Sequence, residues 1–477
     1  MRREKDYIGT AELPSEVLYG IHSLRAKNNF PDTTPFSLYW YKAMGYVKLA
    51  CYKTYKEFKK ATLRIYPQSP LKFLDDEVLS AMISTAEEIA DGKYFEHFIV
   101  PAIQGGAGTS INMAVNEIIA NVSLLKTGNK PGEYNKIHPI EAANIYQSTN
   151  DTVPTALKVA VMFRLNDLEE QINNLRFTIE KLENKYRNVM RIGYTQMQEA
   201  VPSTYGKLFS TYNEALGRDW WRISKCFERI KIVNLGGSAI GTSLTVPRYF
   251  VMNVVQTLRE LTKIPLTRAE NLIDATQNLD AIVEVHGILK ANAVNLEKIA
   301  SDVRLLASEL VNKNELKIPQ KQVGSSIMPS KVNPVIPEFI VSAAHQVYAN
   351  DILISQLAGL GNLELNAYVP LIGHSILKTL DLLIAANKTL NENLFMELII
   401  DSQIANENLY KSPSITTALV PFVGYNKAAE LAAEIRKEHC DIFTANSKLK
   451  IISDEKLKEI LKPDNLIKNG FSVKDTL

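Results

Sequence analysis

Residues 157–182 read LKVAVMFRLNDLEEQINNLRFTIEKL and lie between Pro154 and Pro202, an interval that contains no other proline. Apolar residues recur every three or four positions, at Leu157, Val161, Leu165, Leu168, Ile172, Leu175, Ile179 and Leu182. This spacing is typical of a helix that buries one face along its whole length. A helix of roughly 30 residues is about 45 Å long, which exceeds what one compact globule needs.

Three further stretches have the same periodicity: one between Pro265 and Pro319, one after Pro337, and one over residues 372–400. The alternation of strands and helices that a doubly wound sheet needs is absent. We therefore predict a mainly α fold, with an elongated central helical bundle and smaller N- and C-terminal domains. Apolar residues on several helix faces would let bundles from different subunits pack together, which predicts a homo-oligomer. The predicted domains are 1–146, 147–402 and 403–477.

The composition is that of an ordinary globular protein, with 477 residues, 46% hydrophobic, 22% charged and a net charge of +2. No basic block stands out, so nucleic-acid binding is not predicted. Cys51, Cys226 and Cys440 are far apart, which argues against a disulfide framework and a zinc site. The charged N-terminus lacks an apolar region typical of a signal peptide, and no run of about 18 apolar residues predicts a membrane helix. We expect a cytoplasmic protein without membrane contact.

The most informative motif is residues 324–334, GSSIMPSKVNP, which lie between two helix-patterned regions. Pro329 and Pro334 interrupt any helical turn that contains them. A Gly-Ser-Ser run can direct backbone N–H groups and a hydroxyl toward one point, while Lys331 and Asn333 supply donors suited to a carboxylate. Residue chemistry alone leaves two interpretations open, an ordinary surface loop and a catalytic loop that handles an anion.

This motif closely resembles the signature of the fumarase/aspartase superfamily, G-S-S-x-M-P-x-K-x-N-P, with all eight fixed residues present in eleven positions. An N-terminal segment, LYGIHSLRA at residues 18–26, resembles the aspartase branch of that family. From spacing alone, His22 and Arg25 in this segment would be surface or capping residues. The resemblance covers essentially the whole chain, since residues 403–477 also look like the family's small C-terminal domain.

Two polar segments precede predicted helices. Residues 104–112, QGGAGTSIN, suit a loop that enters a helix N-terminus, where free N–H groups favour an anion. The glycine spacing matches neither a P-loop nor a dinucleotide-binding fingerprint. By themselves these residues are as typical of a structural turn, and residues 147–151, QSTND, are typical of a capping region. The resemblance implies substrate contacts by residues of both segments, namely Thr109, Ser148, Thr149 and Asn150.

A third segment, GYTQMQEAVP at residues 193–202, is by itself typical of a loop. It resembles the family's G-R-T-x-x-Q-D-A-V-P block, with Tyr194 in place of arginine and Glu199 in place of aspartate. Gln196 stands where fumarases have histidine and some aspartases have glutamine. The loss of a guanidinium at position 194 could alter specificity for a dianionic substrate.

The resemblance implies reversible elimination of ammonia from L-aspartate to give fumarate, through an enediolate that needs no cofactor and no metal. Removing a proton from Cβ requires a base and hydrogen-bond donors aimed at the adjacent carboxylate. In the family, the first serine of the signature loop is the base, here Ser325 acting as an alkoxide. The implied substrate-binding residues are Lys331 and Asn333 for one carboxylate, Thr109, Ser148 and Thr149 for the other, and Asn150, Thr195 and Gln196 for the amino group. Glu338 is implied as a supporting residue, hydrogen-bonded to Gln196.

Family members build each site from three subunits, so a homotetramer is implied. An ammonium group can leave already protonated, so the absence of histidine at Gln196 is less damaging for an ammonia-lyase than for a hydratase. Two alternatives stay open. One is fumarate hydratase or another fumarate-releasing lyase, and the other is a degenerate, non-catalytic relative, which only Tyr194 favours.

Overall fold

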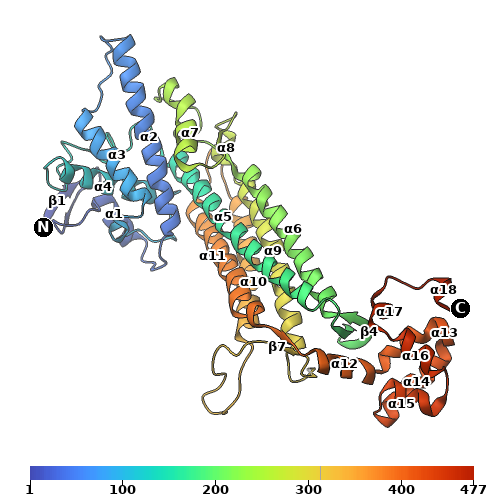
Figure 1. Ribbon diagram of the computed structural model, residues 1–477. Helices are drawn as coiled ribbons and strands as arrows, with labels where there is room; N and C mark the ends of the chain where they lie inside the picture. Colours follow the sequence, from blue (N-terminus) through green and yellow to red (C-terminus); the bar gives the residue numbers. More distant parts are fainter. Residues whose placement is uncertain (312, 477) are drawn as a thin grey trace. The chain divides into compact units, whose positions relative to one another are not determined.

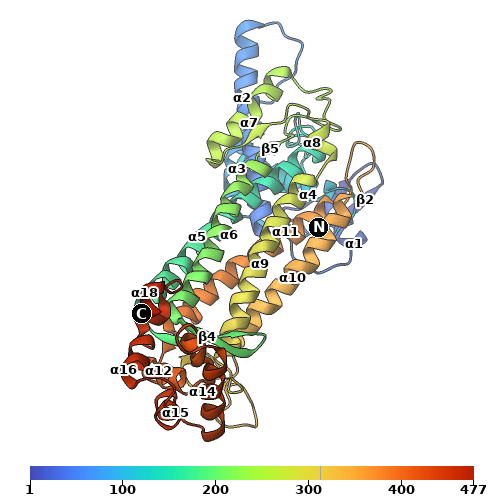
Figure 2. The same cartoon turned by 90° about the vertical axis from the view of Figure 1, so that its right-hand side faces the viewer.

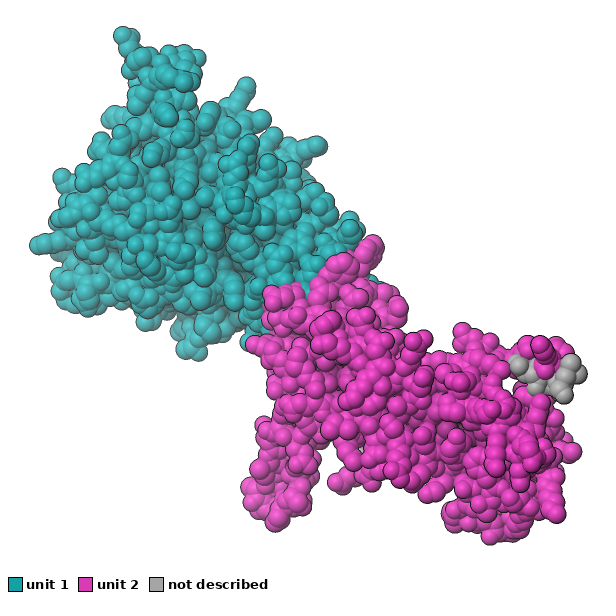
Figure 3. Space-filling model, viewed as in Figure 1, with its two compact units in different colours: residues 1–169, 222–291, 345–383 teal, residues 170–221, 292–344, 384–477 magenta. Residues whose placement is uncertain are grey.

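The computed structural model describes residues 1–311 and 313–476, most of which lie in helices (Figure 1). The chain folds into two compact units, each built from three separate stretches of sequence (Figure 3). Unit 1 comprises residues 1–169, 222–291 and 345–383, and unit 2 comprises residues 170–221, 292–344 and 384–477. Because the boundaries between the units fall within long helices, neither unit is one continuous segment. The predicted division at residues 146 and 402 stays a prediction.

Five long helices contribute a section to each unit, and within each unit these sections run side by side (Figures 1 and 2). The mainly α fold is thereby confirmed. In unit 1, His286 Nε2 lies 2.9 Å from Thr379 Oγ1 on a neighbouring helix. In unit 2, Asn292 Nδ2 donates to Asp219 Oδ2 at 3.1 Å. The five helices are α5 (Thr149–Lys185), α6 (Tyr205–Ile230), α9 (Asp280–Leu306), α10 (Val335–Ala358) and α11 (Val369–Asn393).

Helix α5 confirms the periodic pattern, because all eight apolar residues named above are at most 7% exposed. Burying a side chain of this kind stabilises the fold by roughly 1.5–3 kcal/mol. The helix begins at Thr149, before Pro154, although proline lacks the N–H that would bond to the carbonyl of Asn150. Asn234 Nδ2 donates to that carbonyl at 2.9 Å instead. A tertiary contact therefore allows the helix to extend through the proline.

The rest of unit 1 consists of further helices and short strands, in which α2 packs against α3 and α7. The connection between α2 and α3 contains Pro67 and Pro70. These elements are α1 (Ile21–Asn29), α2 (Leu38–Ile65), α3 (Asp76–Ala90), η1 (Phe95–His97), α4 (Thr109–Lys126), α7 (Arg248–Thr262) and α8 (Asp274–Gln277).

The strands form only two-stranded pairs in the part of the chain that the structure describes, so no doubly wound sheet is present there. The expectation of a loop over residues 193–202 is wrong, because these residues lie in an antiparallel hairpin of β3 and β4. The strands are β1 (Arg2–Lys5) with β2 (Thr10–Leu13), β3 (Met190–Thr195) with β4 (Gln198–Thr204), β5 (Ile232–Val233) with β6 (Thr267–Arg268), and β7 (Leu316–Lys317) with β8 (Ile399–Ile400).

The C-terminal residues form short helices around a small apolar core within unit 2. Met190 and Ile192 of β3 belong to this core, so the hairpin is anchored to the C-terminal helices. These helices are η2 (Phe395–Glu397), α12 (Ser402–Lys411), η3 (Pro413–Leu419), α13 (Val420–Val423), α14 (Tyr425–Glu438), α15 (Ile442–Leu449), α16 (Asp454–Ile460), α17 (Pro463–Ile467) and α18 (Val473–Thr476).

Among the described residues, one helical segment, Val369–Glu397, is long and apolar enough to cross a membrane by length and composition alone. Its most apolar stretch is 61% buried inside the protein, as in the core helix of a soluble protein. Lys378 and Asp381 lie within the segment. Its apolar character is therefore explained by its place in the bundle.

A buried histidine in the bundle predicts the response of stability to acid. The fully buried His286 imidazole contacts Asp351 Oδ1 at 3.0 Å, and Lys290 pairs with the same carboxylate. Burial lowers the pKa of His286, although Asp351 acts in the opposite direction. The folded state therefore binds this proton more weakly than the unfolded state does. Neutral His286 contributes fully to stability at pH values above about 6.5, the pKa of histidine in the unfolded chain. This contribution is lost as the pH falls through the lower pKa that His286 has in the folded protein.

At fixed protein concentration, the His286 side chain should thus contribute less to the urea midpoint at a pH of about 5.5 than at about 7.5, in addition to what other titrating groups contribute. The His286→Gln variant should show a smaller difference between these two pH values. An equal difference in both proteins would assign the acid sensitivity to other groups.

Candidate active site

The signature loop, residues 324–334, is closed by its own hydrogen bonds. Gly324 N donates to Lys331 O at 2.9 Å, and Asn333 Nδ2 donates to Gly324 O at 2.9 Å. A Cβ atom at position 324 would lie 2.7 Å from Asn333 N and 2.8 Å from Lys331 O. Only glycine therefore allows the two ends of the loop to approach this closely. As predicted, the segment is not helical.

The half-buried Ser325 lies where backbone donors converge on its hydroxyl oxygen. Ser325 Oγ accepts hydrogen bonds from Met328 N at 2.9 Å and from Ile327 N at 3.2 Å. Donors aimed at an oxygen favour its charged form over its neutral form. The loop thus supplies part of the stabilisation that a serine alkoxide requires.

Lys331 and Asn333, the loop's proposed hydrogen-bond donors to a carboxylate, differ in whether they already have hydrogen-bond partners. The Lys331 side chain is exposed, and its ammonium makes no ion pair or hydrogen bond with any residue that the structure describes. Asn333 uses one amide hydrogen within the loop. Glu338, at the start of α10, accepts from Arg304 Nη2 at 3.1 Å, and no hydrogen bond joins it to Gln196 within the described residues. Lys331 is the group best placed to meet an external anion.

The β3–β4 hairpin carries Thr195 and Gln196 at its exposed tip. Thr195 pairs directly with Gln198, so only Gln196 and Met197 form the turn. Their φ angles are 50° and 62°, in the left-handed region that a turn of this type usually fills with Asn-Gly. Non-glycine residues held in this region are strained and cluster at functional sites. The strain therefore supports a functional role for the turn.

Tyr194 and Glu199, the two residues of this hairpin that depart from the family pattern, each contact side chains nearby. The Arg191 guanidinium lies 5.8 Å from the ring centroid of Tyr194, so a guanidinium is present beside the substituted position. Glu199 forms an ion pair with Lys313 and accepts from Ser412 Oγ at 2.5 Å. Burial acts to raise the pKa of Glu199, but these two partners hold it below its usual range. Glu199 thereby fastens the hairpin to the junction between α12 and η3.

In unit 1, Thr109 is the first residue of α4, as the glycine pattern predicted. Gly106, Ala107 and Gly108 have φ angles of 87°, 57° and 88°, which turn the chain sharply into the helix. Thr109 N donates to Gly106 O at 2.9 Å, and its side chain is exposed. The threonine hydroxyl thus stands at the positive end of a helix, where anions are favoured.

Ser148 immediately precedes α5, whose first two residues are Thr149 and Asn150, and hydrogen bonds orient the side chains of these two residues. Asn112 Nδ2, one turn along α4 from Thr109, donates to Thr149 Oγ1 at 3.3 Å. Asn150 Nδ2 donates to Ala239 O at 2.7 Å. The structure therefore connects the Thr109 segment to the 148–150 segment within unit 1, while the signature loop and the hairpin tip belong to unit 2.

Asp151 is a structural residue that the sequence did not single out. It is fully buried, and its carboxylate accepts from the backbone N–H groups of Ser148 at 2.9 Å, Gly236 at 3.2 Å and Ser238 at 2.9 Å. Burial raises the pKa of this carboxyl to about 6, and the three donors oppose that shift. Asp151 fixes the backbone from which the three polar side chains project.

Lys48 is a second buried residue whose structural role the sequence pattern did not indicate. This fully buried lysine of α2 places Nζ at 2.6 Å from Asn112 Oδ1, with three more carboxamide oxygens around it, those of Asn116, Asn144 and Gln147. Burial lowers the pKa of its amine to about 7, while the four oxygens favour the charged form because only an ammonium can donate three hydrogens to them. The available signal was a lysine within a segment rich in apolar residues.

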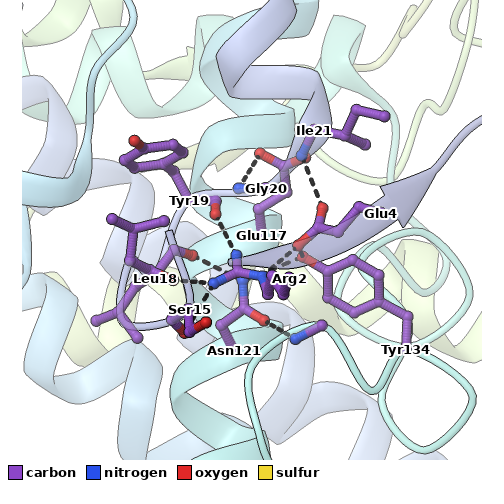
Figure 4. Close-up of polar contacts among 12 residues, drawn as sticks. Arg2, Glu4, Ser15, Leu18, Tyr19, Gly20, Ile21, Glu117, Asn121 and Tyr134 are labelled. Carbon is purple, nitrogen blue, oxygen red and sulfur yellow. Dashed lines mark hydrogen bonds and ion pairs between the residues drawn. The ribbon is translucent and has the colours of Figure 1, made fainter. Parts of the chain in front are cut away.

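Two buried carboxylates hold the segment that carries His22 and Arg25 (Figure 4). Glu117 accepts from the backbone N–H groups of Gly20, His22 and Ser23, and from Ser23 Oγ at 2.5 Å. Glu4 accepts from Ile21 N at 2.8 Å, from Arg2 Nε and from the Tyr134 hydroxyl. Four successive backbone donors at the start of α1 are thereby satisfied.

Arg25, on α1, forms a two-pronged ion pair with Asp6, with contacts of 2.7 and 2.9 Å. Burial lowers the pKa of the His22 imidazole, and Asp6 acts in the opposite direction. The aspartase-like segment is thus a rigid element of unit 1.

Comparisons with known proteins identify the family. A family model described as "Lyase" matches residues 9–349, and one described as "Fumarase C C-terminus" matches residues 415–468. The chain belongs to the fumarase/aspartase superfamily. Among superfamily relatives, the aspartate ammonia-lyase of Helicobacter pylori is 38% identical over 472 residues, 98% of each chain. That of Escherichia coli is 35% identical over 486 residues, covering 99% of this chain and 98% of that one.

Solved structures of superfamily members share the fold. The fumarate lyase:delta crystallin of Brucella melitensis, solved with bound cobalt, has a TM-score of 0.89 at 34% identity, covering 97% of this chain and 98% of that one. A class II fumarase from Schistosoma mansoni has a TM-score of 0.85 at 26% identity with the same coverage. The helical architecture is therefore that of the fumarase and delta-crystallin structures.

Proposed function

We propose that this protein is an aspartate ammonia-lyase, which reversibly eliminates ammonia from L-aspartate to give fumarate. The proposal rests chiefly on the signature loop, in which two backbone N–H groups donate hydrogen bonds to Ser325 Oγ. The side chain of Lys331, six residues later in the same loop, is exposed. The full-length similarity to aspartate ammonia-lyases of several bacteria supports the substrate. Gln196 and the segment around Arg25 support it further.

The proposed chemistry begins with proton removal. Ser325 Oγ, as an alkoxide, takes a proton from Cβ of aspartate, and the electrons of the C–H bond move into the adjacent carboxylate to form an enediolate. The Cα–N bond then breaks, its electrons leave with the amine, and the Cα–Cβ double bond of fumarate forms. Because the protonated amino group leaves as neutral ammonia, no strong general acid is needed at Gln196.

The remaining residues bind and orient the substrate in this proposal. Lys331 and Asn333 hold one carboxylate, and the hydroxyls of Thr109, Ser148 and Thr149 hold the other and receive the enediolate charge. Asn150, Thr195 and Gln196 contact the amino group, and Glu338 has a supporting role. We further propose a homotetramer in which different subunits contribute these segments to one site, since the polar side chains divide between the two units.

The alternative reaction is hydration of fumarate to L-malate, which the similarity to a class II fumarase favours. Expelling hydroxide from malate requires a proton donor at the leaving group, because hydroxide is a far poorer leaving group than ammonia. Fumarases carry histidine where this chain has Gln196, and a carboxamide cannot donate a proton in that way. Aspartate is therefore the better substrate for this site.

The test is to measure the ultraviolet absorbance of fumarate formed by the purified oligomer, with L-aspartate and L-malate assayed in parallel. We expect fumarate from L-aspartate and at least about 100-fold less from L-malate, the size of a missing general acid's contribution. Fumarate from L-malate alone would identify a fumarate hydratase. Fumarate from neither substrate in an intact oligomer would identify a non-catalytic relative or a lyase for another amine.

A further inference from the structure

A pocket between α5 and α6 lies wholly within unit 2 and has no part in the proposed reaction. Its volume is about 370 Å³, enough for a small organic molecule. Arg176 of α5 forms one wall, and residues of α6 form the others. The α6 residues are Asn213, Glu214, Gly217, Arg218, Trp220 and Trp221.

Two buried hydrogen-bond donors at this pocket have no acceptor among the described residues, Arg176 Nε and Trp220 Nε1. They are neighbours, since the Arg176 guanidinium carbon lies 5.8 Å from the Trp220 ring centroid. Within the described part of the chain, the guanidinium makes one hydrogen bond, a long one of 3.4 Å from Nη1 to Asn173 Oδ1. Buried donors are almost always paired in folded proteins, so two adjacent unpaired ones indicate a missing acceptor.

Gly217 creates the space for this arrangement. A Cβ atom at position 217 would lie 3.5 Å from Arg176 Nη2 and 3.7 Å from its Cζ, so the guanidinium packs directly against the α6 backbone. Glycine within a helix is destabilising relative to alanine. Any side chain longer than alanine at this position would occupy the pocket and displace the guanidinium.

The charge of the pocket favours an anion. Arg176 and Arg218 are positive, Glu214 is negative, and within the described residues Glu214 forms no ion pair with either arginine. A carboxylate has two acceptor oxygens and pairs with a guanidinium through two parallel hydrogen bonds. After a small rotation of the Arg176 and Trp220 side chains that turns both buried donors toward the pocket, the carboxylate accepts from Arg176 Nε with one oxygen and from Trp220 Nε1 with the other.

We propose that this pocket binds a small, free carboxylate between α5 and α6, at a site separate from the signature loop. Isothermal titration calorimetry of the full-length oligomer with malonate tests the proposal, and tryptophan fluorescence gives a second signal because Trp220 and Trp221 line the pocket. We expect saturable binding that weakens at least about 10-fold in Arg176→Met, which removes charge-assisted hydrogen bonds. Trp220→Phe keeps the ring, loses the N–H and should weaken binding as well, as measured by calorimetry.

Matched variants distinguish binding in this pocket from binding at the signature loop or on the general surface. Arg187→Met removes an exposed arginine just beyond α5, and Lys331→Met removes the cation of the signature loop. Both variants should bind malonate at the pocket with the affinity of the wild type. Gly217→Leu should abolish the binding by filling the pocket. The proposal is overturned if no saturable binding occurs, which would leave ordered water as the acceptor, or if Arg176→Met binds normally. It is equally overturned if binding disappears only in Lys331→Met, because malonate would then bind at the signature loop. A change of oligomeric state in Arg176→Met, measured by sedimentation, would also overturn it, because the carboxylate would then be a side chain of a second copy of this chain.

Discussion

The Ser325→Ala variant is expected to lower kcat for fumarate formation from L-aspartate by about 1,000-fold or more, with little change in KM. Alanine cannot take the Cβ proton, and a positioned base contributes about 10²–10⁴-fold to such a step. The loss corresponds to about 4 kcal/mol of transition-state stabilisation. Because the proposed role of Ser325 Oγ is to take the reacting proton, its loss should affect the transition state and not the binding of the substrate. Steady-state kinetics on the purified oligomer measure both parameters.

Ser326→Ala is the matched control, since this neighbouring serine is exposed and its hydroxyl makes no hydrogen bond within the described residues. It should keep kcat within a few-fold of the wild type. A structural role for Ser325 predicts a different result, because its hydroxyl also accepts from Ile327 and Met328 N–H groups and could merely cap a turn. A raised KM with kcat retained in Ser325→Ala would establish that role and refute the assignment of the base.

The Lys48→Met variant is expected to lose about 3–5 kcal/mol of stability and about 100-fold in kcat/KM. Methionine matches the length of the side chain but leaves the buried oxygens of Asn116 and Gln147 without a donor among the described residues. Removing one partner of a buried charged network costs energy of this size. Lys48 Nζ bonds to Asn112 Oδ1, and Asn112 Nδ2 in turn bonds to Thr149 Oγ1. A displaced Asn112 would shift Thr149, and a shift of about 1 Å at a binding group costs about 100-fold in rate.

Urea denaturation and steady-state kinetics check the two effects separately. Lys60→Met is the control, because Lys60 lies on the same helix but is exposed. It should leave stability within about 0.5 kcal/mol of the wild type, as surface substitutions usually do. Lys48 acts as a positioning residue only if activity falls more than the fraction of unfolded protein explains. A stable Lys48→Met variant with normal kcat/KM would contradict the proposed link through Asn112.

Most of the fold could be predicted from periodic apolar residues and from proline positions. The pattern from Leu157 to Leu182 predicted α5, because a one-sided apolar repeat is a local property that one helix satisfies by itself. The glycines before Thr109 likewise predicted the entry into α4. The pattern did not predict that α5 extends through Pro154, since this depends on Asn234, which is distant in sequence. It also missed the β3–β4 hairpin, whose two-residue turn lacks the usual Asn-Gly.

The family could be identified from the amino-acid order alone, because the signature loop from Gly324 to Pro334 is contiguous. The same order predicts which side chains take part in the proposed reaction, since each residue type in the loop has an inherent chemical capacity. How those side chains are supported became visible only in the folded chain. Lys48, Asp151 and Glu117 are separated in sequence from many of the groups that they hold, and a single charged residue carries no local signal that it is buried. Their roles arise from long-range contacts, in which burial makes each unpaired polar group costly and so fixes its partners.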